Sequence, residues 1–210
     1  MSERDLRERI AMHGKSLFDR GFTGGSSGNI SVRLPDGLLV TPTNSCMGRL
    51  DPDRISKLSW DGELLEGDKP SKEAFLHLSV YRSRPNENAI VHLHSTHSVA
   101  VSCLADIDEQ NVLPPITAYY VMRVGTLPLI PYYAPGDMAL AEAVEKAANA
   151  SRAVLLANHG PVVAGKDLDA AVYATEELEE TAKLFLMLRG QATRFLTEPQ
   201  CQELRERFPS

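Results

Sequence analysis

The sequence predicts an α/β fold in which helices cover a largely antiparallel central sheet. Two observations predict it. Short apolar runs of strand length are joined by turn residues into hairpins, and these runs are mixed with longer segments whose apolar residues recur at helical spacing. The 210 residues show no internal repeat and no low-complexity linker. We therefore expect residues 1–210 to form a single globular domain.

The chain is predicted to begin with a helix followed by a hairpin. From Glu3 to about Arg20 the apolar residues recur at broadly helical spacing, and the pattern stops at a glycine, as a helix would. A loop rich in glycine and serine comes next. Residues 29–41, which turn at Pro35-Asp36-Gly37, then have the alternation and the turn chemistry of a β-hairpin.

A second hairpin and a helix are predicted in the next part of the chain. The pair Asp61-Gly62 provides the turn of the hairpin. From Ser71 to Tyr81 the pattern becomes helical, and Ser71 has a side chain suited to the N-cap. This assignment places Glu73 in the first turn of the helix.

The second half of the chain is predicted to alternate strands with helices. Strand-like apolar runs occur at 89–94, 127–132 and 153–157, and a returning strand is expected at 161–164. Helical periodicity is found at 138–150 and 167–189, with a short helix expected at 200–207. Strands that are mixed with hairpins and helices in this way favour a sheet with much antiparallel pairing, against which the helices pack.

Composition excludes several classes of function. There are 22 basic and 28 acidic residues, a net charge of −6, and no long run of one sign, so nucleic acid is not an expected partner. The charged N-terminus and the absence of an apolar stretch of about 18 residues predict a cytoplasmic protein without a membrane partner. The three cysteines are odd in number and widely spaced, which favours incidental thiols over disulfides or a cysteine zinc site.

Three histidines have the spacing of metal ligands. In the apolar run that contains His92-Leu93-His94, strand alternation would place both imidazoles on one face of the sheet. His159 follows a second apolar run, at a strand end, where functional groups are commonly displayed. Catalytic metal sites often use about three protein ligands and leave a position open. An HxH pair alone is a weak signal, because strand histidines are often structural, but the third histidine strengthens the prediction.

Glu73 is the expected carboxylate of this site. It could ligate an ion and also transfer a proton, although a glutamate near a helix start is more often a partner of the helix dipole. Three further histidines receive a structural interpretation, as hydrogen-bonded residues of the fold: His77, His97 and His13.

Three loops carry donors suited to an anion. The loop 24–29 matches neither a dinucleotide-binding pattern nor a P-loop, but its backbone N–H groups could form an anion nest. The segment 41–44 and the Ser71-Lys72 pair add hydroxyl, amide and ammonium donors. The sequence suggests one phosphate pocket but does not show that the loops meet.

Taken together, the motifs resemble the class II aldolase and adducin superfamily, and the resemblance covers nearly the whole chain. It implies a three-layer αβα fold with helices over the largely antiparallel sheet, and commonly a homotetramer with active sites near subunit boundaries. It also implies roles for the residues that match the family's motifs. The implied phosphate-binding residues are Gly28, Asn29, Thr43, Asn44, Ser71 and Lys72, and the implied zinc ligands are Glu73, His92, His94 and His159.

Two departures bear on the substrate. Lys72 stands where the family's aldolases usually have a second small residue, and the segment 114–133 is similar to a subgroup that decarboxylates 3-oxo-tetronate 4-phosphates. This subgroup uses a tyrosine as proton donor, a role that falls on Tyr119, with Tyr120 as the competing assignment. The resemblance thus implies a zinc-dependent carboxy-lyase that acts on a phosphorylated sugar acid. Carbon dioxide would leave, and a metal-stabilised enediolate would be protonated to dihydroxyacetone phosphate.

The same motifs also fit alternative functions. The same ligands would serve a sugar-phosphate aldolase that resembles the fuculose-phosphate enzymes, in which an aldehyde leaves instead of carbon dioxide. A non-catalytic scaffold of the adducin type is a further alternative, but such members lack the intact metal set. Manganese, cobalt and iron suit the same nitrogen and oxygen ligands as zinc.

Overall fold

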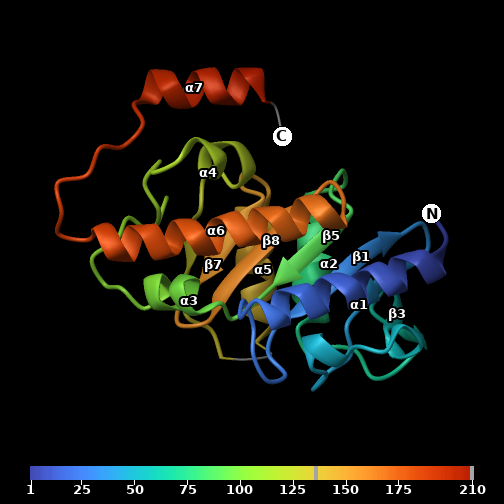
Figure 1. Ribbon diagram of the computed structural model, residues 1–210. Coiled ribbons are helices and arrows are strands. Elements are labelled where there is room, and N and C mark those ends of the chain that lie inside the picture. Colours follow the sequence, from blue (N-terminus) through green and yellow to red (C-terminus); the bar gives the residue numbers. More distant parts are fainter. Residues whose placement is uncertain (135–136, 209–210) are drawn as a thin grey trace.

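One sheet organises the computed structural model, which describes residues 1–134 and 137–208 (Figure 1). Within these residues the strand order is β4-β3-β2-β1-β5-β8-β7-β6, and every neighbouring pair is antiparallel except β6 with β7. The predicted antiparallel character of the sheet is therefore confirmed. The strands are β1 Asn29–Leu34, β2 Gly37–Val40, β3 Ser56–Ser59, β4 Leu64–Glu66, β5 Ala89–His92, β6 Leu129–Ile130, β7 Ala153–Leu156 and β8 Gly160–Gly165.

Both predicted hairpins are present. Strands β1 and β2 pair so that Leu34 lies opposite Gly37, which leaves a tight turn between them. Strands β3 and β4 pair around the turn that contains Gly62, whose φ of +85° suits glycine. The predicted strand at 127–132 is reduced to the two residues of β6, which pair in parallel with β7.

Helices pack on both faces of the sheet. Five of the described helices agree with the sequence-based expectation to within about two residues at most ends. The helices α3 and α4 were not predicted, because helices of 7 and 6 residues are too short to show a clear period. The described helices are α1 Glu3–Asp19, α2 Ala74–Ser83, α3 Thr96–Ser102, α4 Ala118–Arg123, α5 Met138–Ala148, α6 Leu168–Leu188 and α7 Glu198–Arg207, with short 3-10 helices η1 Met47–Arg49 and η2 Pro52–Arg54.

Alternation along the strands divides the core between the two faces. In β5, Ile90 belongs to the cluster that packs with α2 and α5, while Val91 belongs to the cluster that packs with α1 and α6. Figure 1 shows α1 and α6 in front of the sheet and α2 and α5 behind it. In β1 the residues Ile30 and Val32 face α1, which leaves the polar residues between them on the α2 face.

The start of α2 differs from the prediction. Ser71 is not the N-cap of this helix; Glu73 occupies that position and the helix begins at Ala74. The reason is a local turn, in which the Ser71 hydroxyl accepts a hydrogen bond from the backbone N–H of Glu73 at 3.2 Å. Glu73 therefore lies just before the helix and not inside its first turn.

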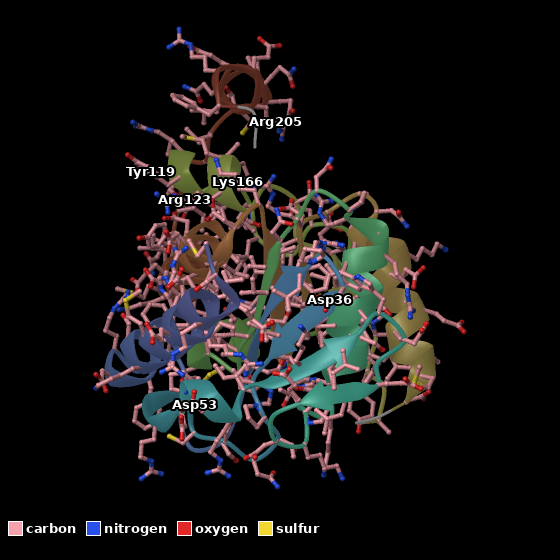
Figure 2. The ribbon with its side chains drawn as sticks, turned by 90° about the vertical axis from the view of Figure 1, so that its right-hand side faces the viewer. Asp36, Asp53, Tyr119, Arg123, Lys166 and Arg205 are labelled. Atoms are coloured by element: carbon pink, nitrogen blue, oxygen red, sulfur yellow. The ribbon has the colours of Figure 1, made fainter. Side chains whose placement is uncertain are left out.

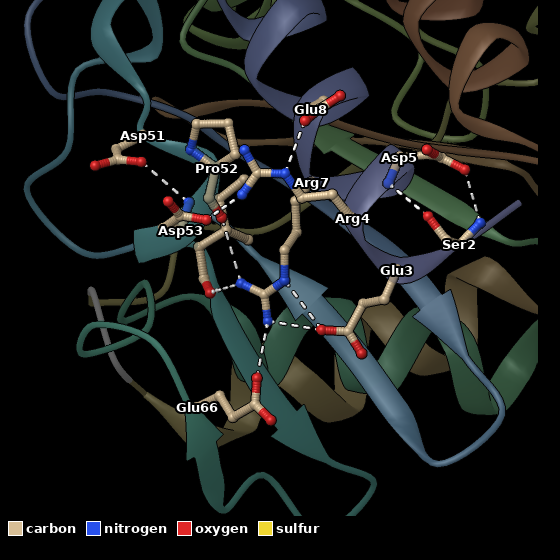
Figure 3. A network of polar contacts seen from close by, with 11 residues as sticks. Ser2, Glu3, Arg4, Asp5, Arg7, Glu8, Asp51, Pro52, Asp53 and Glu66 are labelled. Atoms are coloured by element: carbon tan, nitrogen blue, oxygen red, sulfur yellow. Dashed lines mark hydrogen bonds and ion pairs between the residues drawn. The ribbon is translucent and has the colours of Figure 1, made fainter.

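A buried arginine joins α1 to the edge of the sheet. Arg7 is 7 % exposed and donates to the carbonyl oxygen of Ile55 at 2.6 Å and to the carboxylate of Glu3 at 2.8 Å (Figure 3). It also lies 3.5 Å from the carboxylate of Glu66 on β4. One guanidinium thus links α1, the segment before β3, and β4.

None of the helices within residues 1–134 and 137–208 combines the length and the apolar composition needed to traverse a lipid bilayer.

Replacing Arg7 with alanine should lower the free energy of unfolding by about 2–3 kcal/mol, because the carbonyl of Ile55 would lose its buried donor. Urea denaturation at fixed protein concentration measures the change. Arg4→Ala is the matched control, since Arg4 pairs with Glu8 and Asp53 at the surface and its loss should leave the midpoint unchanged. Equal shifts in the two variants would contradict this account of Arg7.

Candidate metal centre

Four side chains from separate parts of the chain converge at one end of the central strands. His92 is the last residue of β5, and His94 lies two residues beyond it, outside the strand that was predicted to contain both. His159 lies in the turn between β7 and β8. Glu73 lies directly before α2, the helix that packs on the same face of the sheet as α5. The sequence prediction that these four residues meet agrees with the geometry, since their ligand atoms all lie within 4.8 Å of one another.

Two glycines allow the loops to reach this point. A Cβ atom on Gly28 would lie 2.8 Å from the carbonyl oxygen of His92, and one on Gly160 would lie 2.3 Å from that of Leu93. Gly28 also has a φ of +80°, which L-residues with side chains rarely adopt. Glycine at both positions lets the loop before β1 and the turn before β8 pack directly on the end of β5.

The distances between the imidazole nitrogens fit ligands of a single ion. His94 Nε2 lies 3.1 Å from His92 Nε2 and 3.0 Å from His159 Nε2. For a tetrahedral ion with zinc–nitrogen bonds of about 2.05 Å, two ligand nitrogens lie about 3.3 Å apart. The three rings meet edge to face, with centroids 4.7 to 5.0 Å apart, so that the nitrogens share one small volume.

Hydrogen bonding prepares His92 as a ligand. Its Nδ1 lies 2.8 Å from the carbonyl oxygen of Pro161, which can only accept, so Nδ1 carries the proton. His92 is fully buried, and burial lowers the pKa of its imidazole, which favours the neutral ring. The lone pair of Nε2 is therefore directed at the cluster, as in metal sites where a carbonyl orients the ligating histidine.

Glu73 completes the donor set. Its Oε1 lies 3.1 Å from His159 Nε2, and its Oε2 lies 3.4 Å from His92 Nε2. The side-chain amide of Asn29 donates to Oε2 at 2.8 Å. Burial alone would raise the pKa of Glu73, but the neighbouring histidines and the Asn29 amide hold it well below its usual range. The site therefore presents an ionised carboxylate beside three imidazoles, a combination that suits zinc and other divalent transition metals.

The site is closed on its inner side and open on its outer side. His92 and Asn29 are buried, whereas His94 is exposed. A cavity of about 560 Å³ adjoins the open side. It is lined by His94, Thr96, Val99, Tyr132, Tyr133, Asn158 and His159. No spacing pattern in the sequence relates Thr96, Tyr132 or Tyr133 to the histidines, so their position beside the site is not predicted.

The three loops that were predicted to bind an anion are neighbours. The backbone N–H of Thr41 donates to the carbonyl of Ile30 at 3.0 Å, and the N–H of Ser71 donates to the carbonyl of Thr41 at 3.2 Å. The N–H of Thr43 donates to the carbonyl of Lys69 at 2.9 Å. Segment 41–43 thus joins the start of β1, directly after the loop 24–29, to the segment before α2.

The predicted phosphate-binding residues are distributed around these loops. Gly28 and Asn29 lie against the metal cluster, as described above. Thr43 and Asn44 line a cavity of about 260 Å³ that also contains Arg49 and Arg54, whereas Ser71 and Lys72 line a separate hollow beside α2.

The two candidate tyrosines have opposite environments. Tyr119 is 58 % exposed on α4, beside Arg123, whose guanidinium lies 5.7 Å from the centre of its ring (Figure 2). Tyr120 is buried, and its hydroxyl has no hydrogen-bond partner among the described residues. Burial raises the pKa of Tyr120, so it keeps its proton. Tyr119 lines a different cavity from the one beside His94 and His159.

The remaining histidines make hydrogen bonds, in agreement with their structural interpretation. His13 on α1 contacts Asp169 at 2.7 Å, and His97 on α3 contacts Glu179 at 2.8 Å. His77 is fully buried between β1 and α2. Unlike the other two, it is connected to the metal cluster through Asn29.

Comparison with known proteins supports the interpretation of the site. Residues 8–186 match the family described as Class II Aldolase and Adducin N-terminal domain. The chain is 53 % identical over 204 residues to 3-oxo-tetronate 4-phosphate decarboxylase of Escherichia coli strain K12, which covers 97 % of this chain and 96 % of that protein. It is 34 % identical to L-fuculose phosphate aldolase of Haemophilus influenzae, over 99 % of this chain and 95 % of that protein. The crystal structure of YgbL from Escherichia coli superposes with a TM-score of 0.94 at 51 % identity, covering 97 % of this chain and 99 % of that chain.

The metal-free protein should lose stability as the pH falls from 6.5 toward 4. Although His94 as a whole residue is exposed, the partial burial of its ring, followed by the neighbouring imidazoles, lowers its pKa from 6.5 to about 4. In this range the unfolded chain therefore binds a proton that the folded chain does not bind. The free energy of unfolding therefore keeps its full value above pH 6.5 and declines as the pH falls below it. Urea midpoints across this range should therefore depend less steeply on pH in His94→Gln than in the wild type. Parallel curves for the two proteins would contradict the assignment.

Proposed function

The chain belongs to the class II aldolase and adducin family, and on this premise we propose that it is a metal-dependent carboxy-lyase acting on 3-oxo-tetronate 4-phosphate. The observation that carries the proposal is the identity of about half the residues, over nearly the whole length, with proteins of that name. The converging cluster of Glu73, His92, His94 and His159 supports catalysis over a scaffold role.

The four clustered residues would hold the ion, which we propose to be zinc. Three imidazoles and one carboxylate suit zinc well, and they also suit manganese, cobalt or iron. When bound, a divalent ion supplies Lewis-acid stabilisation for the negative charge that develops on the substrate's ketone oxygen. Metal analysis of the purified protein addresses its identity directly.

The neighbouring loops would hold the phosphate group. Backbone N–H groups near Gly28, the side chains of Thr43, Asn44 and Ser71, and the ammonium of Lys72 supply donors of the required kind. Asn29 has a double role in this proposal. Its carbonyl oxygen accepts from His77 and one of its amide hydrogens goes to Glu73, which leaves one amide hydrogen for the substrate.

The reaction breaks one carbon–carbon bond and forms one carbon–hydrogen bond. The electrons of the bond to the departing carboxylate move into the adjacent ketone, carbon dioxide leaves, and the resulting enediolate takes a proton at carbon. The product is dihydroxyacetone phosphate. The reaction takes up one proton, which the hydroxyl of Tyr119 would donate to the carbon. The carboxylate of Glu73, on the buried side of the site, would accept a proton from the substrate and return it.

Tyr119 can take this role only in an assembly. It lies on α4, and Figure 1 shows α4 and α3, the helix that follows His94, on opposite sides of α6. We therefore propose a homotetramer in which Tyr119 reaches the metal centre of a neighbouring subunit. The exposure of Tyr119 supports this, whereas the buried hydroxyl of Tyr120 is unsuited to proton donation.

A sugar-phosphate aldolase is the second candidate. The 34 % identity with an L-fuculose phosphate aldolase along almost the whole chain favours it over other lyases. Aldol cleavage passes through the same kind of intermediate and differs in the fragment that departs. Lys72 is the residue of the phosphate-binding set that we propose distinguishes the two reactions.

The decisive assay supplies 3-oxo-tetronate 4-phosphate, generated in situ by a kinase, and measures carbon dioxide and dihydroxyacetone phosphate. His92→Ala should lose the bound metal and all activity. Glu73→Gln should lower kcat by about 10² to 10⁴-fold while phosphate binding is affected less. Cleavage of fuculose 1-phosphate without release of carbon dioxide would replace the lead proposal with the aldolase.

The tyrosine assignment predicts a contrast between two conservative variants. Tyr119→Phe should reduce kcat by about 100-fold or more, because the proton donor is lost. Tyr120→Phe should remain close to the wild type, since the hydroxyl that it removes has no partner among the described residues. The same assay measures both, and the opposite order of effects would assign the donor to Tyr120.

A further inference from the structure

A chain of buried polar contacts runs from the core to the metal centre. Tyr81 Oη lies 2.9 Å from Ser31 Oγ, and Ser31 Oγ lies 2.6 Å from His77 Nδ1. His77 Nε2 contacts the carbonyl oxygen of Asn29, and the amide nitrogen of Asn29 lies 2.8 Å from Glu73 Oε2. Tyr81, Ser31, His77 and Asn29 are each at most 2 % exposed. Water therefore has little access to these bonds.

The contacts arise because the spacing of the polar residues along β1 matches their spacing along α2. Asn29 and Ser31 are two apart on β1 and point to the same face of the sheet. Glu73, His77 and Tyr81 are four apart at the start and along α2, and they lie on one side of the helix. A step of two residues along a strand spans about 6.6 Å, and a step of four along a helix about 6 Å, so the two rows stay in register.

Each bond in the chain has only one direction that satisfies every group. A carboxylate that ligates metal is ionised and can only accept, so Asn29 must direct its NH₂ group at Glu73 and its carbonyl oxygen at His77. That oxygen can only accept, so His77 carries its proton on Nε2. Burial lowers the pKa of His77 to about 3, and the neutral ring has no second proton.

The remaining bonds follow from this tautomer. The bare Nδ1 of His77 accepts from the Ser31 hydroxyl, which has then used its only hydrogen. Ser31 in turn accepts from the hydroxyl of Tyr81. The aromatic ring of Tyr81 is fixed by Trp60, edge to face at 6.0 Å, and by the guanidinium of Arg33, 4.6 Å from its centre. The far end of the chain is thus anchored in packed core.

We propose that His77 is a positioning residue for Glu73, acting through the amide of Asn29. This inference rests on the proposed metal-dependent function. The Nε2–H of His77 prevents the Asn29 amide from turning its carbonyl oxygen toward the carboxylate, a contact that would repel Glu73 from the cluster. Oε2 of Glu73 is held on one side, and Oε1 faces His159. The link from His77 to the carboxylate runs through Asn29, which holds Glu73 from the buried side.

A purely structural histidine would behave differently. His13 is its matched comparison, because it is also buried and hydrogen-bonded, with its contact to Asp169 on α6. Replacing either histidine removes packing and hydrogen bonds, so both changes should lower stability. Only replacement of His77 should change the metal centre.

The test uses two variants of His77, each of which places a polar side-chain atom at the position of one of the two imidazole nitrogens. The amide nitrogen of Gln reaches the position of Nε2 and preserves a donor to Asn29, whereas Asn reaches only the position of Nδ1. Zinc affinity is measured by competition with a chromophoric chelator, which requires no substrate. His77→Asn should weaken zinc binding and kcat each by about 10 to 100-fold, as is typical for outer partners of metal ligands. His77→Gln should retain most of both, and His13→Asn should bind zinc as tightly as the wild type.

A second measurement needs no variant. Nitrogen-15 NMR of the metal-free protein should show His77 neutral at pH 7 with its proton on Nε2. A proton on Nδ1 would reverse every bond in the chain and overturn the proposal, as would a folded His77→Asn variant with wild-type zinc affinity.

The two proposals fail in different ways. If the wild type does not release carbon dioxide but His77→Asn loses zinc affinity, the proposed substrate is wrong and the role of His77 stands. If the wild type is an active decarboxylase and His77→Asn has unchanged zinc affinity and kcat, the function stands and the role of His77 is wrong.

Discussion

The polar contact between β1 and α2 is the constraint on which the rest of the site depends. A buried polar group without a partner costs about 1–3 kcal/mol, so a row of such groups between a sheet and a helix is tolerated only if every member is bonded. Here the row consists of Asn29 and Ser31 on the strand and Glu73, His77 and Tyr81 on the helix side, and all are paired. Its last member is the carboxylate of the candidate metal centre. The position of that carboxylate is therefore fixed by the packing of two elements of the fold.

The histidines depend on a different feature, the close approach of backbones at the end of β5. The carbonyl of Pro161, at the start of β8, receives the Nδ1 proton of His92, so the strand pairing itself orients this ligand. Gly28 and Gly160 permit the approach because a side chain would collide with the backbone of His92, the last residue of β5, or of Leu93, directly after it. The glycines beside Asn29 and His159 in the sequence thus allow the candidate metal site to form.

Most of this could be predicted from the sequence, and the failures have physical causes. Hairpins, long helices and the set of His92, His94 and His159 with Glu73 follow from periodicity, turn chemistry and ligand type. The cap of α2 was misassigned because Ser71 uses its hydroxyl in a local turn, and side-chain preference does not distinguish a turn from a cap. The buried hydrogen bonds of His77 agree with its structural interpretation, but the apolar neighbours that dominate its local pattern give no sign of its link to the metal cluster. Its connection to Asn29 depends on a contact between residues 48 apart, which no local pattern contains.

The asymmetry of the site bears on which reaction it performs. On the buried side of the site, Asn29 and His77 make hydrogen bonds behind Glu73. An ionised carboxylate beside three imidazoles suits a reaction in which carbon dioxide leaves and equally one in which an aldehyde leaves. The ligand cluster therefore cannot by itself select between them. Selection must come from groups that meet the departing fragment on the open side, where His94 is exposed and the adjoining cavity is lined by Tyr132 and Tyr133. Decarboxylases and aldolases of this fold are therefore expected to differ at positions such as Tyr132, Tyr133 and Lys72. The hydrogen-bonded row behind Glu73 should be the same in both.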